Sequence, residues 1–196
     1  MTRRLAFAAI ASLAAASPAL AHPGALDHGS LAAGMAHPFL GLDHVLALLA
    51  VGLWASLLGA QGERRAVWLV PAAFVGAMAV GFVLALSGLA LPFVEPTILV
   101  SVVVLGLLAA AAYTVPVGAG MALVASFALF HGYAHGGELG GANALGFGLG
   151  FAVSTALLHL AGIGLGRLLG SSAGRILIRF MGGATAVAGL VMAMGA

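Results

Sequence analysis

Long apolar segments alternate with short polar breaks along most of this 196-residue chain. Each segment has about 18 residues or more, enough for a helix to cross the ~30 Å hydrocarbon core of a bilayer. Backbone groups in lipid must be hydrogen-bonded within the segment, so we expect helices. The pattern predicts an all-α integral membrane protein with six transmembrane helices, over about 38–58, 66–88, 96–113, 116–134, 143–166 and 175–195.

The first 21 residues follow a different pattern. Arg3 and Arg4 precede a short apolar run, and Ala19-Leu20-Ala21 forms an Ala-x-Ala cleavage motif. This order is typical of a secretory signal peptide, with an uncleaved anchor helix as the alternative. We therefore expect a cleavable signal peptide over 1–21, an outer polar segment over 22–36, and a six-helix transmembrane domain over 37–196.

Arginine placement predicts the orientation of these helices. Five arginines remain after the signal peptide, and all lie beside the loops after the first and fifth spans: Arg64, Arg65, Arg167, Arg175 and Arg179. Cytoplasmic loops carry an excess of basic residues. With residue 22 delivered to the outside, every one of these arginines falls inside. The chain is thus predicted to lie in the bacterial cytoplasmic membrane with both mature termini in the periplasm.

Composition narrows the functional classes. Hydrophobic residues make up 63% of the chain and charged residues 6%, with no lysine and no cysteine. The chain has no basic patch of the kind that binds nucleic acid, so the expected partners are the lipid bilayer and a divalent metal ion. The lack of cysteine excludes disulfides and thiolate metal sites. No nucleotide-binding loop motif is present, so we do not expect ATP hydrolysis by this chain. The sequence is compatible with a homo-oligomer.

Two short runs of histidine and carboxylate interrupt the apolar pattern. One extends from His37 to His44 and the other from His131 to Glu138, and both fall at the predicted outer ends of spans. Ionisable groups in or against a bilayer are costly and by default mark a substrate or ion path. Imidazole combined with carboxylate suits divalent transition metals. The runs therefore predict an outer metal-binding cluster.

Helical spacing gives the candidate ligands. In the second run the histidines and the glutamate are at i, i+4 and i+7, which places them on one stripe of a helix. If the first span begins at Pro38, His37 and His44 lie one above the other, about 10 Å apart. Interfacial hydrogen bonding of the histidines and helix capping by the aspartate are the structural alternatives. The candidate ligands are His37, Asp43, His44, His131, His135 and Glu138.

The remaining histidines are further candidates. His22 and His28 belong to the outer polar segment, where they could collect metal or simply be solvated. His159 lies deep in the fifth span, one turn after Ser154 and Thr155. It is either a buried histidine satisfied by a neighbour or a relay ligand or proton acceptor on an inward path.

The two runs also resemble known motifs. The string His37-Pro38-Phe39-Leu40-Gly41-Leu42-Asp43-His44 resembles the first motif of the HupE/UreJ family, and Phe130-His131-Gly132-Tyr133-Ala134-His135-Gly136-Gly137-Glu138 resembles its second. Leu158-His159 with Gly162 resembles a third. The resemblance implies a nickel permease, sometimes a cobalt permease, linked to hydrogenase or urease assembly. Tyr133 departs from the histidine that many relatives have at this position.

The prediction is a secondary permease, not an enzyme, that imports Ni(II) into the cytoplasm for hydrogenase or urease maturation. Ni(II), or Co(II), would be a transported substrate and not a permanently bound cofactor. A membrane metal-binding accessory protein or sensor without transport is the alternative. A membrane metalloenzyme would need several HxxxH motifs, and the chain has one. A haem protein would need paired histidines near mid-bilayer, whereas both histidine runs fall at the predicted outer ends of spans.

Overall fold

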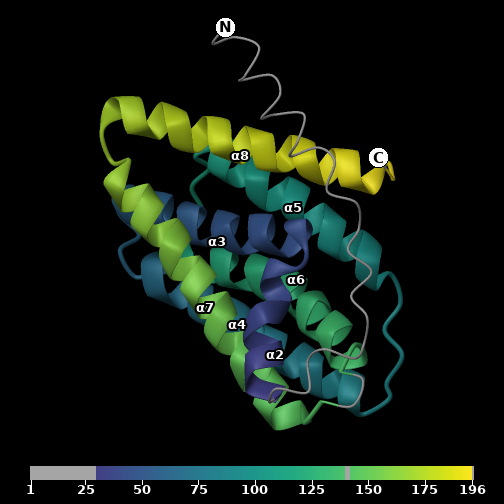
Figure 1. The fold of residues 1–196 in the computed structure, drawn as a ribbon. Coiled ribbons are helices and arrows are strands. Elements are labelled where there is room, and N and C mark those ends of the chain that lie inside the picture. The colour runs from purple at the N-terminus through teal and green to yellow at the C-terminus, as the bar shows by residue number, and fades with distance from the viewer. Residues whose placement is uncertain (1–29, 140–141, 196) are drawn as a thin grey trace, which may run out of the picture.

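The computed structural model describes residues 30–139 and 142–195 (Figure 1). Within these ranges every regular element is helical, which confirms the predicted all-α class. The predicted signal peptide, His22 and His28 lie outside the described residues. The elements are α2 (Ser30–Ala36), the 3-10 turn η1 (His37–Phe39), α3 (Leu42–Ala60), α4 (Ala66–Leu86), α5 (Val94–Ala111), α6 (Val117–Gly137), α7 (Ala144–Leu168) and α8 (Ser172–Ala193).

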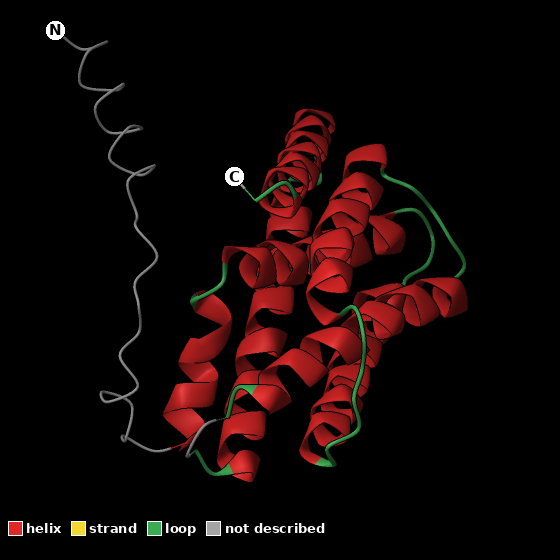
Figure 2. Cartoon of the chain, turned by 90° about the vertical axis from the view of Figure 1, so that its right-hand side faces the viewer, coloured by secondary structure: helices red, strands yellow, loops and turns green. Residues whose placement is uncertain are grey.

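Helices α3 to α8 are each long and apolar enough to cross a membrane. This confirms the predicted six spans and identifies a multi-pass membrane protein. The boundaries differ from the expected ones by a few residues, most at the first span, where α3 begins at Leu42 and not at Pro38. The connections between the helices are short loops (Figure 2).

The chain before α3 is not a continuous extension of that helix. Pro38 begins the short turn η1, and Gly41, with extended backbone angles, separates this turn from α3. The expectation that His37 and His44 occupy one helix is therefore wrong, since the chain changes direction between them. Residues 30–36, expected within a polar outer segment, form helix α2, which packs against α7. Helices α2 and α3 are thus separated by a break at η1 and Gly41, which lies at one end of the bundle.

Helix α3 is the centre of the bundle. Of its span, 61% is buried, against 28–39% for the other five long helices. Helix α7 lies beside α2 and α3 in succession, and α8 lies along α5 (Figure 1). The approach of α3 to α7 requires a glycine, because a Cβ atom on Gly52 would lie 2.2 Å from the carbonyl oxygen of His159. Trp54, fully buried, donates from Nε1 to the carbonyl of Tyr113 at 2.8 Å.

The five arginines within the described residues lie toward the other end of the bundle from the break between η1 and α3. Arg64 and Arg65 are in the turn between α3 and α4, and Arg167 is in the last turn of α7. Arg175 donates to the carbonyl of Gly170, and Arg179 donates to that of Ala110. The two ends of the molecule therefore differ in chemistry, with guanidinium groups at one and imidazoles at the other.

Candidate metal-binding site

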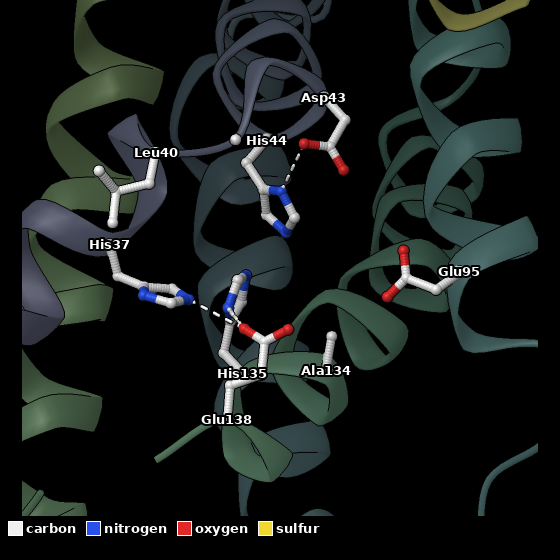
Figure 3. Close-up of a pocket in the computed structure, with 9 residues that line it drawn as sticks. His37, Leu40, Asp43, His44, Glu95, Ala134, His135 and Glu138 are labelled. Atoms are coloured by element: carbon white, nitrogen blue, oxygen red, sulfur yellow. Dashed lines mark hydrogen bonds and ion pairs between the residues drawn. The ribbon is translucent and has the colours of Figure 1, made fainter. Parts of the chain in front are cut away.

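The break between η1 and α3 opens into a cavity of about 250 Å³ that contains most of the predicted ligands. Helix α6 forms its other wall and contributes the second histidine run, while α5 contributes a carboxylate (Figure 3). The lining residues are His37, Leu40, Gly41, Asp43, His44, Glu95, Ala134, His135 and Glu138. A broken helix within a bundle is a place where polar groups line a cavity without exposing backbone to lipid.

Three ligand groups converge at the wall of this cavity. His37 Nε2 lies 3.0 Å from Glu138 Oε2, and His135 Nδ1 lies 3.3 Å from the same oxygen (Figure 3). One ligand atom from each of the three residues lies within 4.8 Å of the others. Two imidazole nitrogens and a carboxylate oxygen at this spacing are suited to a divalent transition metal. We call these three residues the triad.

The two imidazoles of the triad favour the ionised form of Glu138. Glu138 follows the last residue of α6 and is about half exposed. The pKa of Glu138 is lowered well below its usual range, chiefly by the imidazole of His135 and then by that of His37, against the opposing effect of partial burial. A carboxylate that remains charged near two imidazoles favours a cation over a neutral ligand.

His44 and Asp43 extend the triad across the break. His44 Nδ1 and Asp43 Oδ1 are 2.9 Å apart, an arrangement in which the carboxylate accepts from one ring nitrogen and orients the other. That other nitrogen, Nε2, is buried and has no hydrogen-bond partner among the described residues. The His44 ring centroid lies 4.4 Å from that of His135. A Cβ atom on Gly41 would lie 2.6 Å from Asp43 Oδ1, so glycine makes room for the pair.

His131 lies one turn deeper along α6 and is 1% exposed. Its ring centroid is 5.1 Å from that of His44. Nε2 is 2.9 Å from Ser101 Oγ on α5, while Nδ1 has no partner within residues 30–139 and 142–195. An orphaned buried nitrogen is costly unless something binds it. His131 therefore continues the row of imidazoles inward from the cavity.

His159 lies on α7, apart from the other histidines. It is 1% exposed, and neither ring nitrogen has a partner in the described part of the chain. The Phe74 ring separates it from His131, with centroids 5.6 Å from His131 and 5.0 Å from His159. The sequence alternative of a buried histidine satisfied by a neighbour is thus not what the structure shows. Two buried nitrogens without partners make His159 a candidate for transient ligation.

The cluster is recessed into the bundle. The His135 ring is 4.2 Å from that of Phe151, which is the eighth residue of α7 and so about 10 Å along this helix from its start. His135 is 3% exposed. An entrance at the outermost rim was expected, but α2 and the first turns of α7 extend beyond the ligands. The imidazole of His135 is thus recessed, while the Glu138 carboxylate of the triad remains about half exposed.

The sequence prediction did not include Glu95, which lines the cavity, and it considered position 133 as a possible ligand position, which the structure does not place in the cluster. Glu95, in the first turn of α5, faces the cavity from the side opposite His37 (Figure 3). Its signal in the sequence was an isolated carboxylate beside Pro96, on the same predicted outer side as the histidine runs. Tyr133 is not part of the cluster, because its hydroxyl donates to Leu89 O at 2.7 Å and accepts from Leu91 N. It secures the α4–α5 loop.

Comparison with known proteins gives two matches. A family model described as "HupE / UreJ protein" matches residues 10–192. "Protein HupE" of Rhizobium leguminosarum bv. viciae is 48% identical over 187 residues, which cover 95% of this chain and 95% of that protein. No solved structure matches the chain significantly. The family match includes the complete cavity and the row of imidazoles that leads inward from it.

Proposed function

The chain belongs to the HupE/UreJ family, and from this premise we propose that it is a secondary permease for a divalent transition metal, foremost Ni(II). The ion would pass from the periplasm to the cytoplasm for hydrogenase or urease maturation. Co(II), which accepts the same ligand types, is the alternative substrate. The ion is a transported substrate, so the protein needs no permanently bound cofactor.

The observation that carries this proposal is the triad. Ligand atoms of His37, His135 and Glu138 lie within 4.8 Å of one another at the wall of an open cavity. They come from η1 and from the end of α6, which are about 100 residues apart in sequence. A purely structural use of these groups would bury and saturate them, yet His135 Nε2 has no partner among the described residues. The triad is therefore suited to bind an ion and to release it.

The capture step uses the triad together with the His44–Asp43 pair. The Glu138 and Asp43 carboxylates attract the hydrated cation, and the imidazoles replace part of its water. Asp43 fixes the ring of His44 so that Nε2 remains available to the ion. In the outer segment, His22 and His28 are proposed as additional ligands that collect ions before this step.

The inward path leads from His44 to His131 and then past Phe74 to His159. The ring centroids of His44 and His131 are 5.1 Å apart, and the Phe74 ring lies 5.6 Å from His131 and 5.0 Å from His159. His159 is eight residues beyond Phe151 on α7, which corresponds to an advance of about 12 Å through the bundle. Imidazoles with free nitrogens offer weak sites in sequence, and sites that bind weakly favour passage over retention.

The distribution of charge supports an orientation that is compatible with the proposed import. The five arginines of the mature chain lie toward the end opposite the break between η1 and α3. By the preference of basic residues for the cytoplasmic side, the cavity would open toward the periplasm. The ligands would then face the compartment from which the metal arrives.

Nickel accumulation by cells at limiting nickel tests this function. Cells that express the intact protein should accumulate Ni(II) above cells without it, and His44→Ala and His135→Ala should remove most of that gain. Ser126→Ala, an exposed change on α6, is the matched control and should transport normally. Undiminished uptake in both histidine variants at equal expression would contradict the role of the cluster. No gain with the intact protein, combined with Ni(II) binding by the purified protein, would favour an accessory or sensor role.

A further inference from the structure

A second cavity lies at the arginine-bearing end of the bundle, between α3, α4 and α7. Its volume is about 450 Å³, larger than that of the histidine cavity. Gly166 on its wall is seven residues beyond His159, about 10 Å farther along α7. The lining residues are Ser56, Gly59, Ala60, Arg64, Val67, Gly166, Arg167 and Gly170. We call it the arginine cavity.

The charges in the arginine cavity favour an anion. Arg64 and Arg167 both line it, and no carboxylate does. Across residues 30–139 and 142–195, neither guanidinium takes part in an ion pair. Ser56, only 7% exposed, adds a hydroxyl to the same wall. Two guanidinium groups without a protein counter-ion would repel a metal cation, so this cavity is not a second metal site.

The depth of the arginine cavity in the membrane follows from its aromatic neighbour. Arg167 Cζ lies 5.8 Å from the centroid of the Trp68 ring, and Trp68 is 58% exposed on α4. Exposed tryptophans in membrane proteins lie at the level of the lipid headgroups. The guanidinium beside this ring therefore lies at headgroup depth, where the available anions are lipid phosphates.

We propose that the arginine cavity binds the phosphate of an anionic phospholipid headgroup. The planar guanidinium groups of Arg64 and Arg167 donate paired hydrogen bonds to phosphate oxygens, and the Ser56 hydroxyl adds a neutral donor. Basic pockets between helices on the cytoplasmic side suit lipid headgroups. The bound lipid would join α3, α4 and α7 and neutralise the positive charge at the end where a transported cation leaves. This inference stands independently of the proposed metal specificity.

Native mass spectrometry of the purified full-length protein, titrated with phosphatidylglycerol, tests the proposal. We expect tight binding of one lipid, and each of Arg64→Gln and Arg167→Gln should weaken it about tenfold or more, since each removes a charge-assisted hydrogen bond to the phosphate. Arg65→Gln is the matched control, because it removes the same charge from the adjacent position, which does not line the cavity. It should bind the lipid within about twofold of the unmodified protein.

Three further measurements distinguish the sources of phosphate and control for loss of folding. Ser56→Ala makes a smaller change and should weaken lipid binding several-fold without affecting assembly. Phosphatidylcholine and millimolar inorganic phosphate should each fail to displace phosphatidylglycerol. Equal weakening in Arg65→Gln, or equal binding of phosphatidylcholine, would overturn the proposal in favour of general attraction to the bilayer. Displacement by inorganic phosphate would overturn it in favour of a free-anion site.

Discussion

Replacing Asp43 tests whether this carboxylate acts by orienting His44. The two side chains are 2.9 Å apart and mostly buried, with exposed fractions of 20% for Asp43 and 12% for His44. A hydrogen bond to a charged group contributes about 1.5–3 kcal/mol. Loss of a carboxylate that orients a ligating histidine typically lowers metal affinity 10- to 100-fold. These two magnitudes agree, because 1.4 kcal/mol corresponds to a factor of ten.

Two substitutions separate orientation from charge. Asp43→Ala removes the hydrogen bond and the charge, and should raise the Ni(II) concentration for half-maximal uptake about 10- to 100-fold. Asp43→Asn keeps an oxygen that accepts from His44 Nδ1, so it should raise that concentration only about tenfold or less. Glu63→Gln is the control, since it removes one negative charge from the α3–α4 turn, at the opposite end of α3 from the histidine cavity.

Uptake of radioactive nickel over a range of concentrations distinguishes these outcomes. The account requires a graded series in which Asp43→Ala is worse than Asp43→Asn, and the maximal rate changes less than the half-saturating concentration. Identical behaviour of the two variants would refute the orienting role. A complete loss of uptake in both would instead indicate that the carboxylate binds the ion directly.

Further predictions concern pH, the inward path and helix packing. Uptake should be measured over external pH from about 7 to about 5.5, a range that lies above the ordinary carboxyl pKa of about 4.3. Glu138, with its lowered pKa, remains ionised over this window, so Glu138→Gln should reduce uptake at every pH tested. His159→Ala should lower the maximal rate while leaving the half-saturating concentration within about twofold, as measured in the same assay. A Cβ atom on Gly132 would lie 1.8 Å from the Met78 carbonyl, so Gly132→Ala should destabilise the protein by about 1–3 kcal/mol in thermal unfolding in detergent. Gly118→Ala on the same helix meets nothing within 4 Å and should not destabilise it.

The six spans and the grouping of the arginines could be predicted because they depend on local composition. A helix in lipid needs only enough apolar residues to cross the bilayer, and the sequence shows that directly. The stripe of His131, His135 and Glu138 could also be predicted, since α6 is a regular helix to Gly137. Spacing within one helix is a property that the sequence alone carries.

The break before α3 could not be predicted from the same rules. Pro38 is as suitable for the start of a long helix as for the turn η1. The break lies at Gly41, whose backbone is extended and where a side chain would collide with the Asp43–His44 pair. That constraint is visible only when the pair is in place. The stacking of α2 against α7, where Ser154 Oγ donates to Met35 O, is likewise a contact between distant segments.

The position of Glu95 and the role of Tyr133 depend on how helices pack together. Glu95 reaches the cavity because α5 lies beside α3, an arrangement that hydropathy does not specify. Tyr133 lies within the second histidine run in sequence, but its direction on α6 takes the hydroxyl to the α4–α5 loop. Tyr133 therefore supplies a loop contact and no ligand atom of the cavity.

A structure of the full-length protein with Ni(II), with anomalous scattering recorded at the nickel edge, tests the central claim most directly. The account predicts a nickel peak within bonding distance of His37, His135 and Glu138, and loss of that peak in His135→Ala. A peak held by other residues, with the triad still joined through Glu138 as described, would contradict the account.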